Sequence, residues 1–193
     1  PILFNNKFFA KVQKIMMRTA LALLILTCGS LFVINKLGGE RDNLPHVLLI
    51  GDSISIGYTP HVTRILENEA VVLHQEGNAQ DTWNGSLKLE KWIGIRDWDV
   101  IHFNWGLWDL AYRHPNSKTL GNRDKVNGTL TTTLEDYESN LNELVERLKQ
   151  TDAKLIWAHT TIVPVGAAGR FEGDARNYNG VDLRVLRQLD VTV

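Results

Sequence analysis

Four short apolar runs, separated by segments of helical periodicity, constrain the fold of this chain more than any other feature. The runs cover residues 46–50, 70–74, 100–104 and 154–159. Neighbouring parallel strands need long connections, usually helices, so strands that alternate with helices are typical of a parallel sheet. We therefore predict an α/β fold, a three-layer α/β/α sandwich around a parallel sheet, within residues 45–193.

Helical patterns fill the intervals between these runs. The clearest follows Thr133, a residue type that caps helices, and places apolar residues at helical spacing along one face. Those residues are Tyr137, Leu141, Leu144, Val145 and Leu148. The pair Thr59-Pro60 predicts the start of an earlier helix, because proline suits the first helical turn.

Two further helices are predicted over residues 84–93 and 174–189. After the second of these, residues 191–193 read Val-Thr-Val and are predicted to begin a fifth strand. We therefore expect the last strand and helix of such a domain to lie beyond Val193.

Composition excludes several classes of protein. The chain has 193 residues, of which 44% are apolar, enough for one domain with a core. A net charge of -1, with no basic run after the N-terminal segment, argues against a nucleic-acid partner. The single cysteine, Cys28, and histidines without zinc-site spacing lead us to expect no disulfide framework, metal or cofactor.

The N-terminal segment, residues 1–35, has the pattern of a signal peptide or membrane anchor. Basic residues between positions 7 and 18 precede an apolar stretch over 20–34. We predict a linker over 36–44 and an extracytoplasmic protein: periplasmic, secreted, or anchored to a membrane through this segment alone. The alternative is that the apolar stretch forms a buried helix.

A serine follows the first apolar run at the predicted turn from strand to helix, in Gly51-Asp52-Ser53. A helix start presents unpaired N–H groups and the positive end of a dipole, which suit an oxyanion. A serine in this place can attack an acyl carbon while its own N–H holds the oxygen. The alternative is a capping or turn role, which Ser and Asp fill in many helices.

Three segments resemble sequence blocks of the SGNH (GDSL) hydrolase superfamily, which comprises serine esterases and lipases. They are Gly51-Asp52-Ser53, residues 76–82 with Gly77, and residues 104–109. The third departs from the family pattern Gly-x-Asn-Asp, because Trp108 stands where the family has asparagine. The resemblance covers residues 45–193 and implies a flavodoxin-like α/β/α fold.

The resemblance also implies roles for individual residues. Ser53 is the expected nucleophile, and the backbone N–H groups of Ser53 and Gly77 are the expected oxyanion donors. Asp52, Gly106 and Asp109 are expected to support the site. Asp109 would either orient its turn by accepting backbone N–H bonds or serve as a plain helix cap.

The third oxyanion donor is open, because Trp108 replaces the family's asparagine. An indole donates one hydrogen bond and accepts none. Three alternatives remain: Trp108 donates in an altered geometry, Trp108 closes part of the pocket, or Asn104 supplies the amide.

The family's fourth block is a late Asp-x-x-His, which supplies the base and its orienting acid, and no such block follows residues 104–109 in this sequence. We expect both residues beyond Val193; the competing expectation is a natural, inactive truncation. Among the histidines present, we predict a structural role for His159, a core position for His102 and a solvated one for His114.

Five tryptophans fall between positions 83 and 108. We predict core packing for Trp92 and Trp98, whereas Trp105 and Trp108 could either pack or form an aromatic wall for a sugar or acyl group. The polar loop over 111–132 is a candidate substrate rim.

The leading functional hypothesis is an exported serine esterase that hydrolyses small acyl esters, with acetyl groups on carbohydrate as one case, through a Ser53 acyl-enzyme. Its partner would be a small-molecule or glycan ester. The alternative is a non-catalytic module that binds glycan or acyl ligands on the same fold. A flavodoxin-like nucleotide or phosphate binder is a third hypothesis, although no glycine-rich loop with a following lysine supports it.

Overall fold

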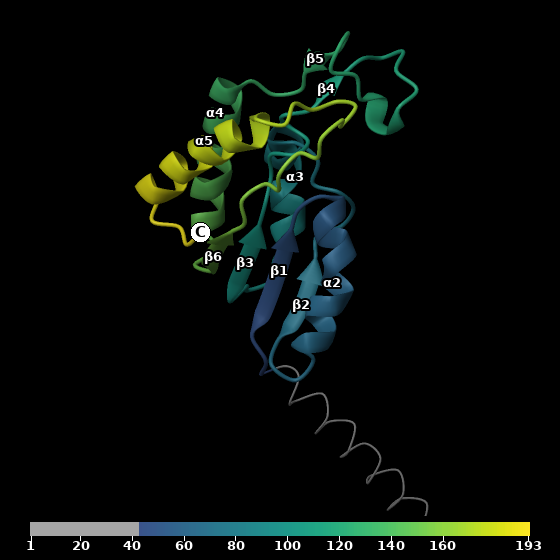
Figure 1. Ribbon diagram of the computed structural model, residues 1–193. Coiled ribbons are helices and arrows are strands. Elements are labelled where there is room, and N and C mark those ends of the chain that lie inside the picture. The colour runs from purple at the N-terminus through teal and green to yellow at the C-terminus, as the bar shows by residue number, and fades with distance from the viewer. Residues whose placement is uncertain (1–42) are drawn as a thin grey trace, which may run out of the picture. The chain divides into compact units, whose positions relative to one another are not determined.

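The computed structural model describes residues 43–193, and the expectations for a signal segment and most of the linker lie outside them. Four parallel strands form the main sheet in the order β2-β1-β3-β6 (Figure 1). They are β1 (His46–Ile50), β2 (Val71–His74), β3 (Val100–Phe103) and β6 (Lys154–Trp157). The predicted strands are thus confirmed, with the last three ending or starting one or two residues inside the predicted bounds.

Helices cover both faces of this sheet, which confirms the three-layer arrangement (Figure 1). The helices are α2 (Ser53–Ile65), α3 (Thr82–Ile93), α4 (Leu134–Lys149) and α5 (Asp174–Gln188). On one face α2 packs against β1 and β2, while α3 and α4 lie together on the other face and α5 packs on α4. No helix among the described residues is both long and apolar enough to span a membrane.

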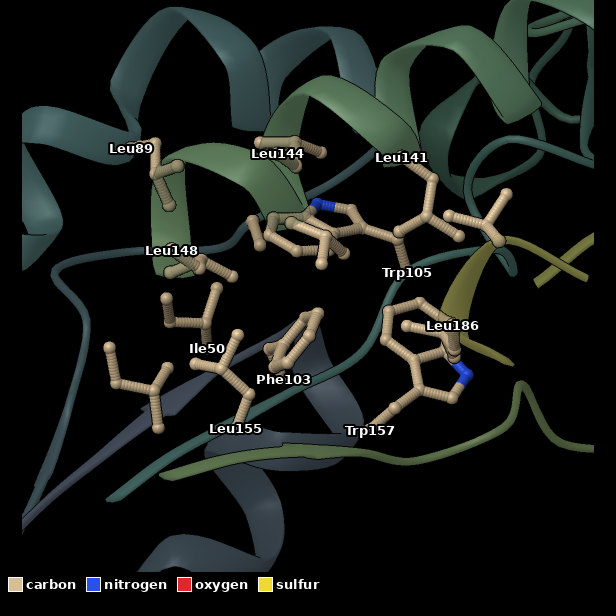
Figure 2. Packing of buried hydrophobic residues seen from close by; sticks show 14 of the residues in the cluster. Ile50, Leu89, Phe103, Trp105, Leu141, Leu144, Leu148, Leu155, Trp157 and Leu186 are labelled. Carbon is tan, nitrogen blue, oxygen red and sulfur yellow. The ribbon is translucent and has the colours of Figure 1, made fainter. Parts of the chain in front are cut away.

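The main core lies between the sheet and α4. Alternate residues of the strands point to this side, among them Ile50, Phe103 and Trp157. Figure 2 shows them facing Leu141, Leu144 and Leu148 of α4. Thr133 caps α4 as predicted, because its Oγ1 accepts a hydrogen bond of 3.1 Å from Asp136 N.

The predicted helix start at Thr59-Pro60 is wrong. Helix α2 begins six residues earlier, at Ser53, and Pro60 lies inside it. Asp52 caps the helix by accepting a 2.9 Å hydrogen bond from Ile54 N. Thr59 is an interior residue whose hydroxyl donates to the Ser55 carbonyl at 2.6 Å.

The segment predicted as a loop over 111–132 contains short regular elements. Strands β4 (Tyr112–Arg113) and β5 (Thr129–Leu130) pair antiparallel and enclose the short 3-10 helix η1 (Leu120–Asn122). At the end of the chain, Thr192 forms a parallel bridge with Ile156 of β6, as the predicted fifth strand requires.

Trp105 packs against a glycine of α3, which leaves no room for a larger residue. A Cβ at Gly85 would lie 2.8 Å from Cζ2 of Trp105, whose side chain is 1% exposed. Gly180 of α5 has no atom within 4 Å of such a Cβ. The two helical glycines therefore differ in the space that is available for a side chain.

We expect Gly85→Ala to lower the free energy of unfolding by about 1–3 kcal/mol through overpacking, although alanine favours helix more than glycine. Gly180→Ala should instead raise it by up to about 1 kcal/mol. Urea unfolding followed by tryptophan fluorescence measures both. Stabilisation by both substitutions would contradict the packing of Trp105 on Gly85.

Candidate active site

The turn after β1 leaves Ser53 exposed at the first position of α2. Because the buried carboxylate of Asp52 already caps the helix, Ser53 is not needed for that role. Gly51 makes the turn possible by its small size, since a Cβ there would lie 2.7 Å from Ser55 Oγ. The turn thus presents one serine to solvent and buries the next, Ser55, beneath it.

Ser55 forms part of a hydrogen-bonded support below the turn. Its Oγ lies 2.8 Å from the Asp52 carbonyl and 2.7 Å from His74 Nε2. His74 Nδ1 lies 2.8 Å from the Gln75 carbonyl. The sequence patterns did not identify this serine–histidine pair, in which buried Ser55 and partly buried His74 support the turn from below.

Gln75 joins the first block to the second. Its Nε2 donates to the Gly51 carbonyl at 2.7 Å and to the Gly77 carbonyl at 3.3 Å, while its Oε1 accepts from Gly51 N at 3.1 Å. A further bond of 3.0 Å runs from Ala79 N to the Gly51 carbonyl. Nothing in the sequence distinguished this buried glutamine from its neighbours.

Two backbone donors are free at this end of the sheet. Within residues 43–193, neither Ser53 N–H nor Gly77 N–H has a hydrogen-bond partner. Gly77 has φ of 76°, a conformation that favours glycine. A pocket of about 360 Å³ lies beside it, lined by Ile56, Thr59, Pro60, His74, Gln75 and Gly77.

The turn after β3 is tied to the neighbouring strand ends. Asn104 N donates to the Ile50 carbonyl at 3.0 Å, and Asn104 Nδ2 donates to the Ala158 carbonyl at 2.5 Å. Gly106 lies against Thr160, because a Cβ at Gly106 would be 2.9 Å from the Thr160 Cβ. The structure therefore brings the turns after β1, β3 and β6 together at the carboxyl end of the parallel sheet, with the Asn104 amide already bonded to backbone.

Asp109 orients this turn from a fully buried position. Its Oδ2 accepts from Gly106 N at 3.1 Å, and its Oδ1 accepts from Thr82 N at 2.9 Å and from Thr82 Oγ1 at 2.6 Å. Of the two predicted roles, acceptance of backbone N–H bonds is the one observed. The carboxylate also joins the turn to the first residue of α3.

The tryptophans of the site region divide between core and surface. Three of them are buried: Trp92, Trp98 and Trp105. This confirms the core packing predicted for Trp92 and Trp98, and it shows that Trp105 packs and does not line an aromatic wall. Trp108 is partly exposed, and the Arg113 guanidinium carbon lies 4.4 Å from its ring centroid. The Trp108 indole N–H has no hydrogen-bond partner in the described part of the chain.

His159 interacts with a buried carboxylate. Its Nδ1 lies 3.0 Å from Asp182 Oδ1, and Asp182 Oδ2 also accepts from Trp157 Nε1 at 3.0 Å. Burial raises the pKa of the Asp182 carboxyl, and the hydrogen bond from His159 opposes that rise. No histidine of residues 43–193 hydrogen-bonds to Ser53.

The other two histidines of interest are only half-buried. His102 was predicted in the core, but it lies on the sheet face toward α2, with Nδ1 3.5 Å from the Tyr58 hydroxyl. Partial burial lowers the pKa of His102. His114, predicted as solvated, accepts a 3.3 Å hydrogen bond from Asn116 N. Among the described residues, no group of three or more His, Cys, Asp or Glu side chains could hold a metal ion.

The buried Asp109 carboxyl predicts a pH-dependent contribution to stability. Burial raises its pKa to about 6, against the lowering effect of the Thr82 hydrogen bonds. In the unfolded chain the pKa is about 4. Below about pH 4 the carboxyl is protonated in both the folded and the unfolded protein. Above about pH 6 the folded protein bears a buried charge. The contribution of Asp109 to the free energy of unfolding therefore declines as the pH rises between these values.

We expect the difference in unfolding free energy, wild type minus Asp109→Asn, to fall by about 3 kcal/mol from pH 4 to pH 7. Urea unfolding of both proteins at intervals across this range measures the difference. A difference that does not vary with pH would contradict the raised pKa.

Comparisons with known proteins identify the fold. No family model matches the sequence, and no curated protein matches it. The lipase/acylhydrolase from Enterococcus faecalis superimposes with a TM-score of 0.61 at 18% identity, over 78% of this chain and 75% of the other. The acetyl xylan esterase AlAXEase gives 0.57 at 15% identity, over 76% and 75%. A GDSL-like lipase from Bacteroides thetaiotaomicron gives 0.55 at 12%, over 80% and 68%. The strand order, the Gly51-Asp52-Ser53 turn and these superpositions together show that the chain has the SGNH/GDSL hydrolase fold.

Proposed function

We propose that this protein is a serine ester hydrolase that removes small acyl groups, acetyl among them, through an acyl-enzyme on Ser53. The observation that carries the proposal is the exposed Ser53 at the start of α2, in a turn that Gln75 ties to the Gly77 turn, with the N–H groups of Ser53 and Gly77 unpaired among residues 43–193. A nucleophile and backbone donors for the oxyanion are two of the components that acyl transfer requires, and a base for the serine proton is the third. The solved structures with this fold include proteins named as esterases and acylhydrolases.

In the proposed reaction Ser53 Oγ forms a bond to the acyl carbon and gives its proton to a base. The carbonyl oxygen becomes negative and accepts hydrogen bonds from the two backbone N–H groups. Collapse breaks the bond to the alcohol oxygen, which takes up a proton and leaves. Water then adds to the acyl-enzyme and releases the acid, which restores the Ser53 hydroxyl.

Two further elements of the proposal have narrower support. A carbohydrate alcohol is suggested by the partly exposed Trp108 at the site and by a solved structure of the same fold named as an acetyl xylan esterase. An extracytoplasmic location is suggested by the basic and apolar pattern of residues 1–35 alone. Membrane contact, in this proposal, is confined to that segment.

We expect Ser53→Ala to reduce hydrolysis of p-nitrophenyl acetate by about a thousandfold or more, because the nucleophile is lost. Ser139→Ala, which alters an exposed serine of α4, is the matched control and should retain full activity. Treatment with a fluorophosphonate should add one phosphonyl group to the wild type and none to Ser53→Ala, as intact mass spectrometry can show.

Turnover that survives in Ser53→Ala would contradict the proposal. Binding of acyl or glycan ligands without any turnover, unchanged in Ser53→Ala, would favour a binding module instead. His159→Gln tests the base: a loss of turnover with an unchanged melting temperature would assign that role to His159 and overturn the structural role predicted for it.

A further inference from the structure

Three arginines from separate segments meet at the carboxyl end of the sheet. Arg113 belongs to β4, Arg123 follows η1 and Arg170 lies in the connection from β6 to α5. Arg113 and Arg123 are neighbours through an antiparallel bridge. A Cβ at Gly169 would lie 2.5 Å from the Arg123 Cβ, so the segment that carries Arg170 packs directly on Arg123.

The hydrogen bonds of this arginine cluster, Arg113, Arg123 and Arg170, go to neutral groups. Arg113 donates to the Gly121 carbonyl and, at 3.2 Å, to Thr131 Oγ1. Arg123 Nε donates to the Leu120 carbonyl at 2.8 Å, and Arg170 Nε donates to the Leu107 carbonyl at 2.7 Å. Within residues 43–193 none of the three forms an ion pair with a carboxylate. Each guanidinium has five N–H donors, so several remain available to a ligand.

The cluster therefore gathers positive charge that no directly paired carboxylate offsets among residues 43–193. Burial, together with the charge of the other arginines, lowers the pKa of Arg113 and Arg170. The carboxylates of Asp81 and Asp52 act in the opposite direction. Both of these aspartates are engaged as helix caps, on Asn84 N and Ile54 N. Arginine stays charged under these conditions, so an anion bound between the guanidinium groups would relieve the repulsion.

The arginine cluster adjoins the Ser53 site through the turn after β3. Arg170 bonds to the carbonyl of Leu107, and Arg113 stacks on the ring of the next residue, Trp108. A cavity of about 630 Å³ opens beside Arg113, lined also by His114, Pro115, Gly121, Asn122 and Thr129. The turn after β3 thus connects the arginine cluster to the end of the sheet where Ser53 lies.

We propose that the arginine cluster binds an anionic group, a carboxylate or a phosphate, on the alcohol part of the ester. The substrate class is then an acylated acidic molecule. The assignment to the alcohol part rests on the proposed function, because a small acyl group such as acetyl carries no charge. Anion binding by the arginine cluster does not depend on the proposed function. Planar guanidinium groups match the paired oxygens of both anions.

The kinetic test compares 4-acetoxybenzoate with 4-acetoxybenzamide, which differ in charge and little in size. We expect the wild type to prefer the anionic ester in kcat/KM, and this preference to fall with added salt. Arg113→Gln and Arg123→Gln should each reduce the preference by about tenfold. Arg96→Gln is the matched control, because Arg96 also stacks on a tryptophan, Trp98, but contacts His46 at the start of β1. An equal preference in wild type and cluster variants would overturn the proposal.

A binding test separates this inference from the proposed function. Calorimetric titration of Ser53→Ala with benzoate and with phenyl phosphate distinguishes the two anions and needs no turnover. We expect the affinity to fall about tenfold in Ser53→Ala/Arg123→Gln, with the melting temperature checked to confirm folding. Anion binding without Ser53-dependent turnover would sink the esterase proposal and leave the anion site standing. Absence of binding, or binding unaffected by Arg123→Gln, would overturn the anion site.

Discussion

The carboxylate of Asp109, buried without a counter-ion among residues 43–193, is the interaction on which the site end of the molecule depends. Three hydrogen bonds, from Gly106 and from both donors of Thr82, offset the cost of its desolvation. They join the turn after β3 to the start of α3. The same α3 carries the glycine against which Trp105 packs, so turn, helix and core are positioned together.

Buried polar side chains hold the backbone of the site, and the groups proposed to react are exposed. Gln75 fixes the first two turns relative to each other, and Asp52 caps α2 from below the surface. Ser53 has no side-chain bond within the described residues and is available to a ligand. Support of this kind fixes donors before a substrate arrives, which is the condition under which hydrogen bonds to a developing charge are most effective.

Sequence patterns predicted the regular elements well where periodicity is long. The four parallel strands and the α4 cap follow from apolar runs and from Thr133. Thr59-Pro60 has the residue types of a helix start but lies inside α2, whereas the predicted turn from strand to helix at Gly51-Asp52-Ser53 is where the helix begins. Strands of two residues, such as β4, have no periodicity to detect.

Side-chain assemblies were the least predictable part of the candidate site. Gln75 is one polar residue after a strand, and its role depends on a close approach of Gly51 and Gly77 that no spacing reveals. The arginine cluster joins positions 113, 123 and 170 through loop packing alone. Such groups depend on the path of irregular backbone, which local sequence specifies weakly.

The free backbone amides at Ser53 and Gly77 have a consequence for how such proteins diverge. An amide N–H is present whatever side chain a residue carries, so only the turn's conformation must persist as the sequence drifts. Substitutions elsewhere can then accumulate until little recognisable similarity is left. Superposition on solved structures at 11 to 18% identity, where no family model matches, shows that the backbone fold is shared although few side chains are.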